Sequence, residues 1–322
     1  MTTKIIGTGS YVPDMLVSND DLSKIVDTSD QWIADRTGIR FRRIADPALE
    51  TTASMAAKAA KRALENAHMA AEQLDFIITA TSTPDCHFPN TSCLVQKELG
   101  GGDAMCYDLS AACTGFVFAL GTAHAFIKAG IYKTGLVIGA DCMSRITDWS
   151  DRGTCVLFGD GAGAAVVTAG ETGLVHMVLQ SDGSREQVLR CGLGRPENTL
   201  LKQPAALEYT SMNGQEVFKF AVKQVPESIH RLLAESGTPI EEVDGFLLHQ
   251  ANERIIASVA KRLKAPADRF PVNLTHYGNT SGASVPILMD ECSRTGRLRR
   301  GEKIVLSGFG AGLTWGSILL VW

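Results

Sequence analysis

The chain has 322 residues, of which 45% are apolar, 20% are charged and 7% are aromatic. This composition excludes a disordered protein, and the length suggests about two domains or one large two-layered unit. Lys and Arg total 31 and Asp and Glu total 35, so the formal net charge is −4 (31 − 35). No electrostatic attraction to nucleic acid is therefore expected.

The ends and the cysteines exclude further classes. The first ten residues, MTTKIIGTGS, lack the apolar core and cleavage site of a signal peptide. No segment approaches the ~20 apolar residues that cross a bilayer, so we expect no membrane association. The eight cysteines include no C-x-x-C pair, and disulfide frameworks are typical of small secreted domains. We expect a cytoplasmic protein with reduced thiols, and no Cys/His spacing suits a metal.

Helical and strand patterns alternate along the first half of the chain. In chain order they predict a helix at 51–70, a strand at 76–80, a helix at 91–99, a strand at 105–109, a helix at 112–129 and a strand at 136–139. Such alternation predicts a parallel or mixed sheet with helices on both faces, and the strands are the continuous apolar runs that two-sided burial requires. Residues 182–212, rich in glycine and charge, predict a loop.

The second half repeats the first at an offset of 169 residues. Four identities fall in one window, where Arg62, Leu64, Glu72 and Asp75 meet Arg231, Leu233, Glu241 and Asp244. The same offset aligns three further elements: 77–78 with 246–247, 110–115 with 279–284, and 137–139 with 306–308. We therefore predict an internal duplication, with one α/β half at 1–171 and a second at 172–322.

One cysteine has the setting of a nucleophile. Cys113 lies in DLSAACTG (108–115), where a strand ends and a helix begins. A thiol in the first turn of a helix feels the positive end of the helix dipole, which favours the thiolate. The alternative is a small buried residue in a tight turn, the role we assign to the other seven cysteines.

Two polar residues could assist Cys113. His249 follows the apolar strand at 245–248, at the sheet edge where α/β proteins place ligands; alternatively it is a hydrogen-bonded loop residue. Asn279 lies in a small polar loop, where a helix N-cap is the alternative. At the offset of 169, Cys113 aligns with Gly282. If the halves pack about a pseudo-dyad, Cys113, His249 and Asn279 converge at their centre.

An ordered set of motifs over essentially the whole chain resembles a known family. The motifs are DQWIADRTGIR at 30–40, DLSAACTG at 108–115, DRGT at 151–154, FGDGAGA at 158–164, HQANER at 249–254, YGNTSG at 277–282 and GFGAGLTWG at 308–316. In this set and order they resemble β-ketoacyl-acyl-carrier-protein synthase III, a condensing enzyme of the thiolase-like superfamily. The resemblance implies an α/β thiolase-like fold whose two duplicated halves pack as five αβαβα layers.

The resemblance also implies a reaction. Cys113 would take the acyl group of a short acyl-CoA, with acetyl-CoA first. Malonyl-acyl carrier protein would then lose CO2 and attack the acyl group in a decarboxylative Claisen condensation that starts bacterial fatty-acid synthesis. The backbone N–H groups of Cys113 and Ala311 would form the oxyanion hole, and His249 and Asn279 would donate hydrogen bonds to the enolate.

Further roles follow from the same resemblance. CoA would bind Trp32, Arg36, Arg152, Phe218 and Asn252, with Trp32 and Arg152 flanking its adenine. Acyl carrier protein would bind Arg254, Lys261 and Arg262, although a solvated charged face is the alternative there. Phe88, reaching in from a neighbouring subunit, and Met143 would line the acyl pocket.

The resemblance implies a homodimer and no cofactor beyond the two thioester substrates. Two other functions stay open: a specialised condensing enzyme or acyltransferase with the same Cys-His-Asn set, and a non-catalytic acyl-CoA-binding protein.

Overall fold

Two β-sheets, one from each half of the sequence, form the framework of this computed structural model, which describes residues 1–192 and 194–322. The first has the order β1 (Thr2–Tyr11), β7 (Asp160–Gly170), β6 (Thr134–Cys142), β4 (Phe76–Ala80), β5 (Met105–Leu109). The second has the order β8 (Leu174–Ser181), β13 (Thr314–Val321), β12 (Lys303–Gly310), β11 (Gly245–Leu248). Two-stranded sheets are formed by β2 (Leu16–Ser18) with β3 (Phe41–Arg43), and by β9 (Leu189–Arg190) with β10 (Ser211–Met212).

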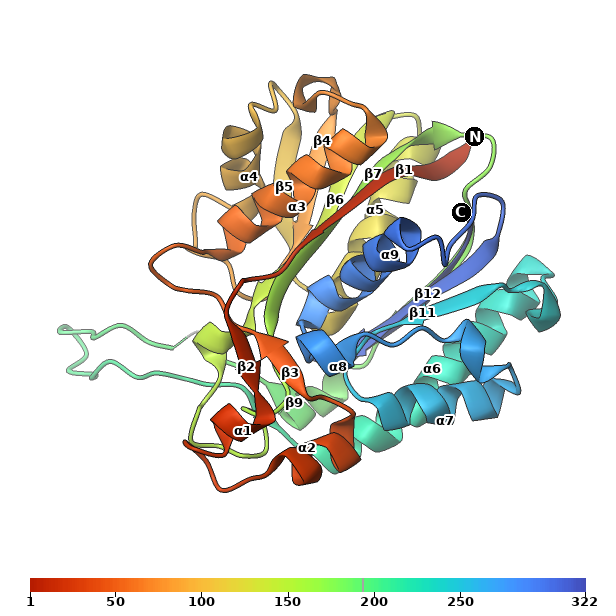
Figure 1. Cartoon of the computed structure of the whole chain (residues 1–322). Coiled ribbons are helices and arrows are strands. Elements are labelled where there is room, and N and C mark those ends of the chain that lie inside the picture. Colours follow the sequence, from red (N-terminus) through yellow and green to blue (C-terminus); the bar gives the residue numbers. More distant parts are fainter. Residues whose placement is uncertain (193) are drawn as a thin grey trace.

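Helices complete five layers (Figure 1). Helices α3 (Thr52–Ala67) and α4 (Thr91–Leu99) cover the outer face of the first sheet. Helices α5 (Gly115–Lys128) and α9 (Ser284–Arg294) lie between the sheets and share one apolar core with both. Helices α6 (Gly214–Ser236) and α7 (Glu253–Leu263) cover the second sheet. The short helices α1 (Asn19–Leu22), α2 (Asp30–Thr37) and α8 (Leu274–Tyr277) complete the set. The predicted thiolase-like αβαβα architecture is confirmed.

Small residues bring the outermost layer close to the first sheet. Alanines at 56, 59, 60 and 63 form the buried face of α3. Opposite them, a Cβ at Gly7 or Gly9 of β1 would collide with the backbone carbonyls of Ala63 or Ala59. Helix α3 therefore approaches β1 backbone to backbone, and begins at Thr51, whose side chain accepts from the Ser54 N–H.

The predicted elements and the repeat agree with the structure. Strands 76–80 and 105–109 and helix 91–99 have the predicted bounds, whereas the strand predicted at 136–139 extends to Thr134–Cys142. Adding 169 to β4 and β6 gives β11 and β12 to within one residue at each end. The four strands of the second sheet also repeat the parallel and antiparallel pairings of β4, β6, β7 and β1. The domain boundary at 171/172 stays a prediction; it falls in the turn between β7 and β8.

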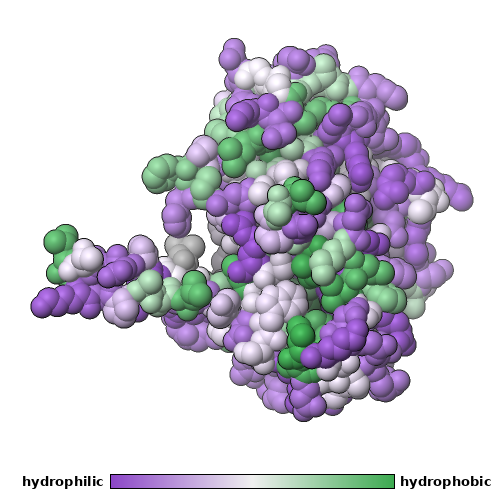
Figure 2. All heavy atoms as spheres, turned by 60° about the vertical axis from the view of Figure 1, so that its left-hand side comes forward, coloured by the Kyte–Doolittle hydropathy of each residue, from purple (hydrophilic) through white to green (hydrophobic). Residues whose placement is uncertain are grey.

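Most of the predicted loop 182–212 is an extended arm. Beyond a 3-10 turn at Gly183–Val188, the backbone pairs antiparallel at Arg195 with Ala206 and at Asn198 with Gln203. Figure 2 shows this arm standing off from the body of the molecule, with Leu200 93% exposed. Among the described residues, no helix is long and apolar enough to span a membrane.

Candidate active site

Both halves of the chain present the same tight turn at the centre of the molecule. Strand β5 ends at Leu109, and Cys113 lies in a 3-10 turn (Ala112–Thr114) that leads into α5. In the second half, Ser281–Ala283 leads likewise into α9. Ala112 and Ser281, 169 residues apart, both have positive φ, +46° and +51°, a strained conformation for residues other than glycine. The two turns touch, because Cys113 Sγ donates to Ser281 Oγ at 3.6 Å.

The thiol of Cys113 is buried, with the residue 7% exposed. Burial, together with the nearby Asp141 carboxylate, raises its pKa to about 12 against the opposing effect of the hydrogen bond with Ser281. The helix N-terminus was expected to favour the thiolate and so to lower the pKa of Cys113. The net shift of this pKa is upward, so the expectation is wrong. The position of Cys113 before α5 is as predicted, but loss of hydration outweighs the helix dipole. Cys113 therefore rests as a neutral thiol.

His249 follows β11, and its N–H continues the strand pairing by donating to the Ser307 carbonyl at 2.8 Å. Its Nδ1 lies 2.6 Å from Ser284 Oγ, and the Phe309 ring packs edge-on against the imidazole, with centroids 5.1 Å apart at 71°. Burial lowers the pKa of His249 to about 3. The imidazole is therefore neutral at physiological pH.

Two hydrogen bonds fix Asn279, one made by its backbone and one by its side chain. Its backbone N–H donates to the Leu157 carbonyl at 2.8 Å, and its Oδ1 accepts from the Ser281 N–H at 2.9 Å. A backbone N–H can only donate, so this contact identifies the oxygen of the side-chain amide. The amide NH2 is then the free end of a residue that lines the cavity shared with Cys113 and His249. The three residues predicted to converge lie together.

Sequence reasoning missed a buried carboxylate near Cys113. Asp141, in β6, is fully buried and accepts from the N–H groups of Ser82 at 2.7 Å and Gly282 at 3.0 Å, and from two threonine hydroxyls. Burial raises the pKa of Asp141 against these donors. Asp141 thus ties the turn after β4 to the turn before α9. The sequence signal that could have found it is a carboxylate, Asp141, within the buried strand segment 134–142.

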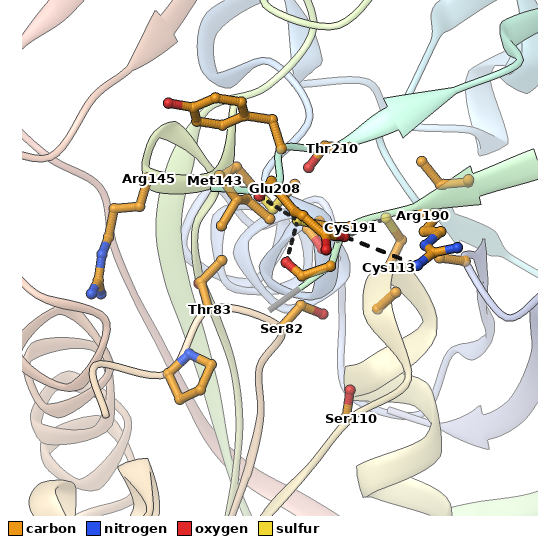
Figure 3. Close-up of a pocket in the computed structure, with 18 of the residues that line it drawn as sticks. Ser82, Thr83, Ser110, Cys113, Met143, Arg145, Arg190, Cys191, Glu208 and Thr210 are labelled. Carbon is orange, nitrogen blue, oxygen red and sulfur yellow. Dashed lines mark hydrogen bonds and ion pairs between the residues drawn. The ribbon is translucent and has the colours of Figure 1, made fainter. Parts of the chain in front are cut away.

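Cys113 borders two cavities. The first, of 740 Å³, is called here the Met143 cavity, and its lining includes Met143, Ala311 and Cys191. Figure 3 shows Cys113, Met143 and Cys191 around it. The second, of 1100 Å³, is called here the Trp32 cavity, and its lining includes His249 and Asn279. Cys113 therefore lies between the two cavities, and both predicted hydrogen-bond donors line the Trp32 cavity.

The predicted CoA residues gather along the Trp32 cavity. Trp32, Arg36, Phe218 and Asn252 line it. Arg152 lies directly on Trp32, with Cζ 4.8 Å from the ring centroid. A base held between two surfaces needs about 7 Å, twice a carbon contact distance. Without a base between them, the two side chains stack on each other by a cation–π contact, and their placement on either side of the adenine stays a prediction.

The remaining predicted residues are placed as follows. Arg254 lies at the mouth of the Trp32 cavity and Lys261 and Arg262 are exposed in the last turn of α7. Phe88 is 86% exposed and does not line the Met143 cavity of its own chain.

Ala311 is not among the described non-glycine residues with positive φ, so alanine is unstrained there. Among the described residues, no group of His, Cys, Asp and Glu could hold a metal ion.

A buried thiol, a neutral imidazole and an amide at the centre of two duplicated halves define a condensing acyltransferase of the thiolase-like superfamily. Two family models match: 3-oxoacyl-[acyl-carrier-protein (ACP)] synthase III over residues 107–183, and the C-terminal model of the same synthase over 233–322. The chain belongs to the β-ketoacyl-[acyl-carrier-protein] synthase III family.

Relatives across the whole length support this assignment. The β-ketoacyl-[acyl-carrier-protein] synthase III of Clostridium acetobutylicum is 51% identical over 100% of this chain and 99% of its own. The solved synthase of Aquifex aeolicus is 46% identical, with a TM-score of 0.93 over 99% of this chain and 100% of its own. The priming β-ketosynthase of the R1128 polyketide pathway is 35% identical, with a TM-score of 0.93 over 99% and 96% of the two chains.

Proposed function

We propose that the chain condenses a short acyl-CoA with malonyl-acyl carrier protein, the first carbon–carbon bond of fatty-acid synthesis, releasing CoA and CO2. The observation that carries the proposal is the place of Cys113 between two cavities. A thioester entering by the Trp32 cavity reaches the thiol, and the Met143 cavity beyond receives the acyl group. After CoA leaves, the same entrance admits a second thioester.

In the first stage, Cys113 Sγ attacks the thioester carbonyl of the acyl-CoA. The S–C bond to CoA breaks, the acyl group stays on Sγ, and the proton of the thiol ends on the released CoA thiol. The thioester is already activated, so a nucleophile with a pKa near 12 needs to lose its proton only as the bond forms. The N–H groups of Cys113 and Ala311 would stabilise the oxyanion.

In the second stage, the malonyl group loses CO2 and its electron pair forms an enolate. His249 and Asn279 would donate to the enolate oxygen from the Trp32 side. The α-carbon then attacks the acyl carbonyl on Cys113, the C–S bond breaks, and the departing thiolate takes a proton from solvent to regenerate the neutral thiol. A neutral imidazole and an amide can serve this oxygen without a change of charge, because neither is ionised at physiological pH.

The approach to the site is cationic and aromatic. Arg36 and Arg152 both lie over the Trp32 ring, at 4.3 and 4.8 Å. In the proposal the adenine of CoA displaces Arg152 and stacks on the Trp32 ring. The guanidinium groups of Arg36 and Arg152 then bind the phosphates of CoA. Arg254, Lys261 and Arg262 on α7 would receive the acidic carrier protein, a local basic patch on a chain of net charge −4.

A second copy of the chain would complete the acyl pocket. The Met143 cavity, at 740 Å³, exceeds the needs of an acetyl group, and the exposed ring of Phe88 from a second copy would shorten it. Strand β5 is an edge strand with every residue partly exposed, so it could pair across a dimer. The proposal includes a homodimer, a cytoplasmic location, acetyl-CoA as the first primer and no cofactor beyond the two substrates.

The test follows the acyl group. Intact mass is measured after incubation with acetyl-CoA, and again after malonyl-acyl carrier protein is added, with Cys113→Ala as the control. An acetyl adduct that malonyl-acyl carrier protein discharges supports the proposal. An adduct that it leaves intact would favour a specialised condensing enzyme or acyltransferase with another acceptor; the 35% identity to the R1128 priming ketosynthase supports the specialised condensing enzyme. No adduct would favour the binding protein.

A further inference from the structure

We propose that Ser284 is a positioning residue that fixes His249 as the tautomer with its proton on Nε2. The hydroxyl of Ser284 donates to Nδ1, which leaves the Nε2–H group as the donor directed to the reaction. This inference rests on the proposed function for its catalytic consequence, but the tautomer itself is a property of the protein alone.

The two hydrogen-bond contacts of the Ser284 hydroxyl determine whether it donates to His249 or accepts from it. Its Oγ lies 2.6 Å from His249 Nδ1 and 3.3 Å from the backbone nitrogen of Gln250. The Gln250 N–H can only donate, so it takes one lone pair of Oγ. Among the described residues, Nδ1 is the one acceptor recorded for the Ser284 hydroxyl. Ser284 is 2% exposed, so a proton pointing elsewhere would be buried without a partner, which costs about 1–3 kcal/mol.

The ring cannot turn to exchange its nitrogens without losing its contacts. The Phe309 ring stands at 71° to the imidazole, and Phe309 is itself 3% exposed. His249 is 2% exposed, which leaves little room for rotation about its side chain. The Nδ1 edge is therefore committed to Ser284 and the Nε2 edge to the cavity that His249 lines with Cys113.

The hydroxyl is a feature of the second half alone. Position 284 corresponds to Gly115 at the offset of 169, and a Cβ at Gly115 would lie 2.8 Å from the Cβ of Ala80. The first half thus has no space for a side chain where the second half carries one. The two turns otherwise share their backbone conformation, so the hydroxyl marks a specialisation of the half that bears His249.

A single turn then orients both proposed donors. The Ser281 N–H sets the side-chain amide of Asn279, and the Ser284 hydroxyl sets the imidazole of His249 three residues later. In both cases the hydrogen bond leaves N–H on the other end of the side chain, the NH2 of Asn279 and the Nε2–H of His249, to donate to an oxygen in the Trp32 cavity. Without the Ser284 hydroxyl the Nδ1–H tautomer becomes accessible, and in that tautomer Nε2 presents a lone pair that repels an enolate oxygen.

The kinetic test separates the two stages. In Ser284→Ala, we expect discharge of the acetyl adduct by malonyl-acyl carrier protein to fall about 10- to 100-fold. Acetylation of Cys113 should stay within about threefold, because the acyl transfer does not use Nε2–H. Ser284→Thr keeps a hydroxyl and should restore discharge. Ser228→Ala is the matched control: this serine is 2% exposed and bonds Ser317 at 3.0 Å, and it lines neither cavity beside Cys113. Equal loss of both stages in a folded Ser284→Ala, or no restoration by a folded Ser284→Thr, would overturn the proposal.

The tautomer is read directly by NMR. The protein is labelled with [15N]histidine, and the His249 signals are those absent from His249→Gln. We expect the wild-type ring to carry its proton on Nε2, and Ser284→Ala to show both tautomers. A proton on Nδ1 in the wild type would overturn the proposal. If the wild type forms no adduct or does not discharge it, the proposed function fails, while the NMR spectrum still decides the role of Ser284.

Discussion

Folding buries His249 as a neutral imidazole, so part of the pH dependence of stability must come from this residue. Burial lowers its pKa from 6.5 to about 3, and the unfolded chain therefore binds the proton more readily. The contribution to stability is intact above pH 6.5 and is lost as the pH falls toward 3. At pH 5, 1.5 units below 6.5, the loss is about 2 kcal/mol at ~1.36 kcal/mol per unit.

The assay is urea unfolding of the wild type and of His249→Gln at pH 8 and pH 5. Gln does not titrate, so the wild type should lose about 2 kcal/mol more than the variant between the two pH values. The buried carboxyls Asp141 and Asp160 titrate in both proteins and cancel in the difference. A difference between the two proteins that is the same at both pH values would refute the neutral buried imidazole.

Three further predictions concern the nucleophile and its neighbours. Because the pKa of Cys113 is about 12, its alkylation by iodoacetamide should accelerate about tenfold per pH unit from 7 to 9; peptide mass spectrometry measures this, and a plateau in that range would contradict it. Asn279→Ala should keep acetylation but slow discharge by malonyl-acyl carrier protein about 10²–10³-fold; equal loss of both steps would make Asn279 structural. Gly310→Ala places a Cβ 2.8 Å from the Cβ of Cys113, and we expect acetylation by acetyl-CoA to fall at least about tenfold. Gly183→Ala, where a Cβ meets nothing within 4 Å, is its control; equal rates in the two variants would show that the turn tolerates the displacement.

The periodic features of the fold were predictable from the sequence. Apolar runs such as 76–80 and 136–139 are strands because burial on both faces demands continuous hydrophobicity. The offset of 169 predicted that the turn at Cys113 and the turn at Asn279 occupy matching places, and the contact from Cys113 to Ser281 agrees with it.

Contacts between segments that are remote in the sequence were not predictable. Asp141, Ser281 and Ser284 carry no periodic signal, because their roles come from single hydrogen bonds between segments remote in sequence. The thiol pKa was mistaken because the helix dipole can be inferred from local sequence, whereas desolvation depends on the packing of both halves. The stacking of Arg152 on Trp32 joins segments 120 residues apart (152 − 32) and has no local pattern.

The paired turns with positive φ at Ala112 and Ser281 have a consequence for how this chain tolerates change. The copy of position 113 is Gly282, where an added Cβ would lie 3.1 Å from the Ala112 carbonyl and 3.3 Å from Asp141. A side chain at 282 would therefore require these neighbours to move by a few tenths of an ångström. In the proposed function, the first half supplies the reacting thiol at this pair of positions and the second half carries the glycine. A substitution in either turn therefore acts on the same site, because the two turns touch.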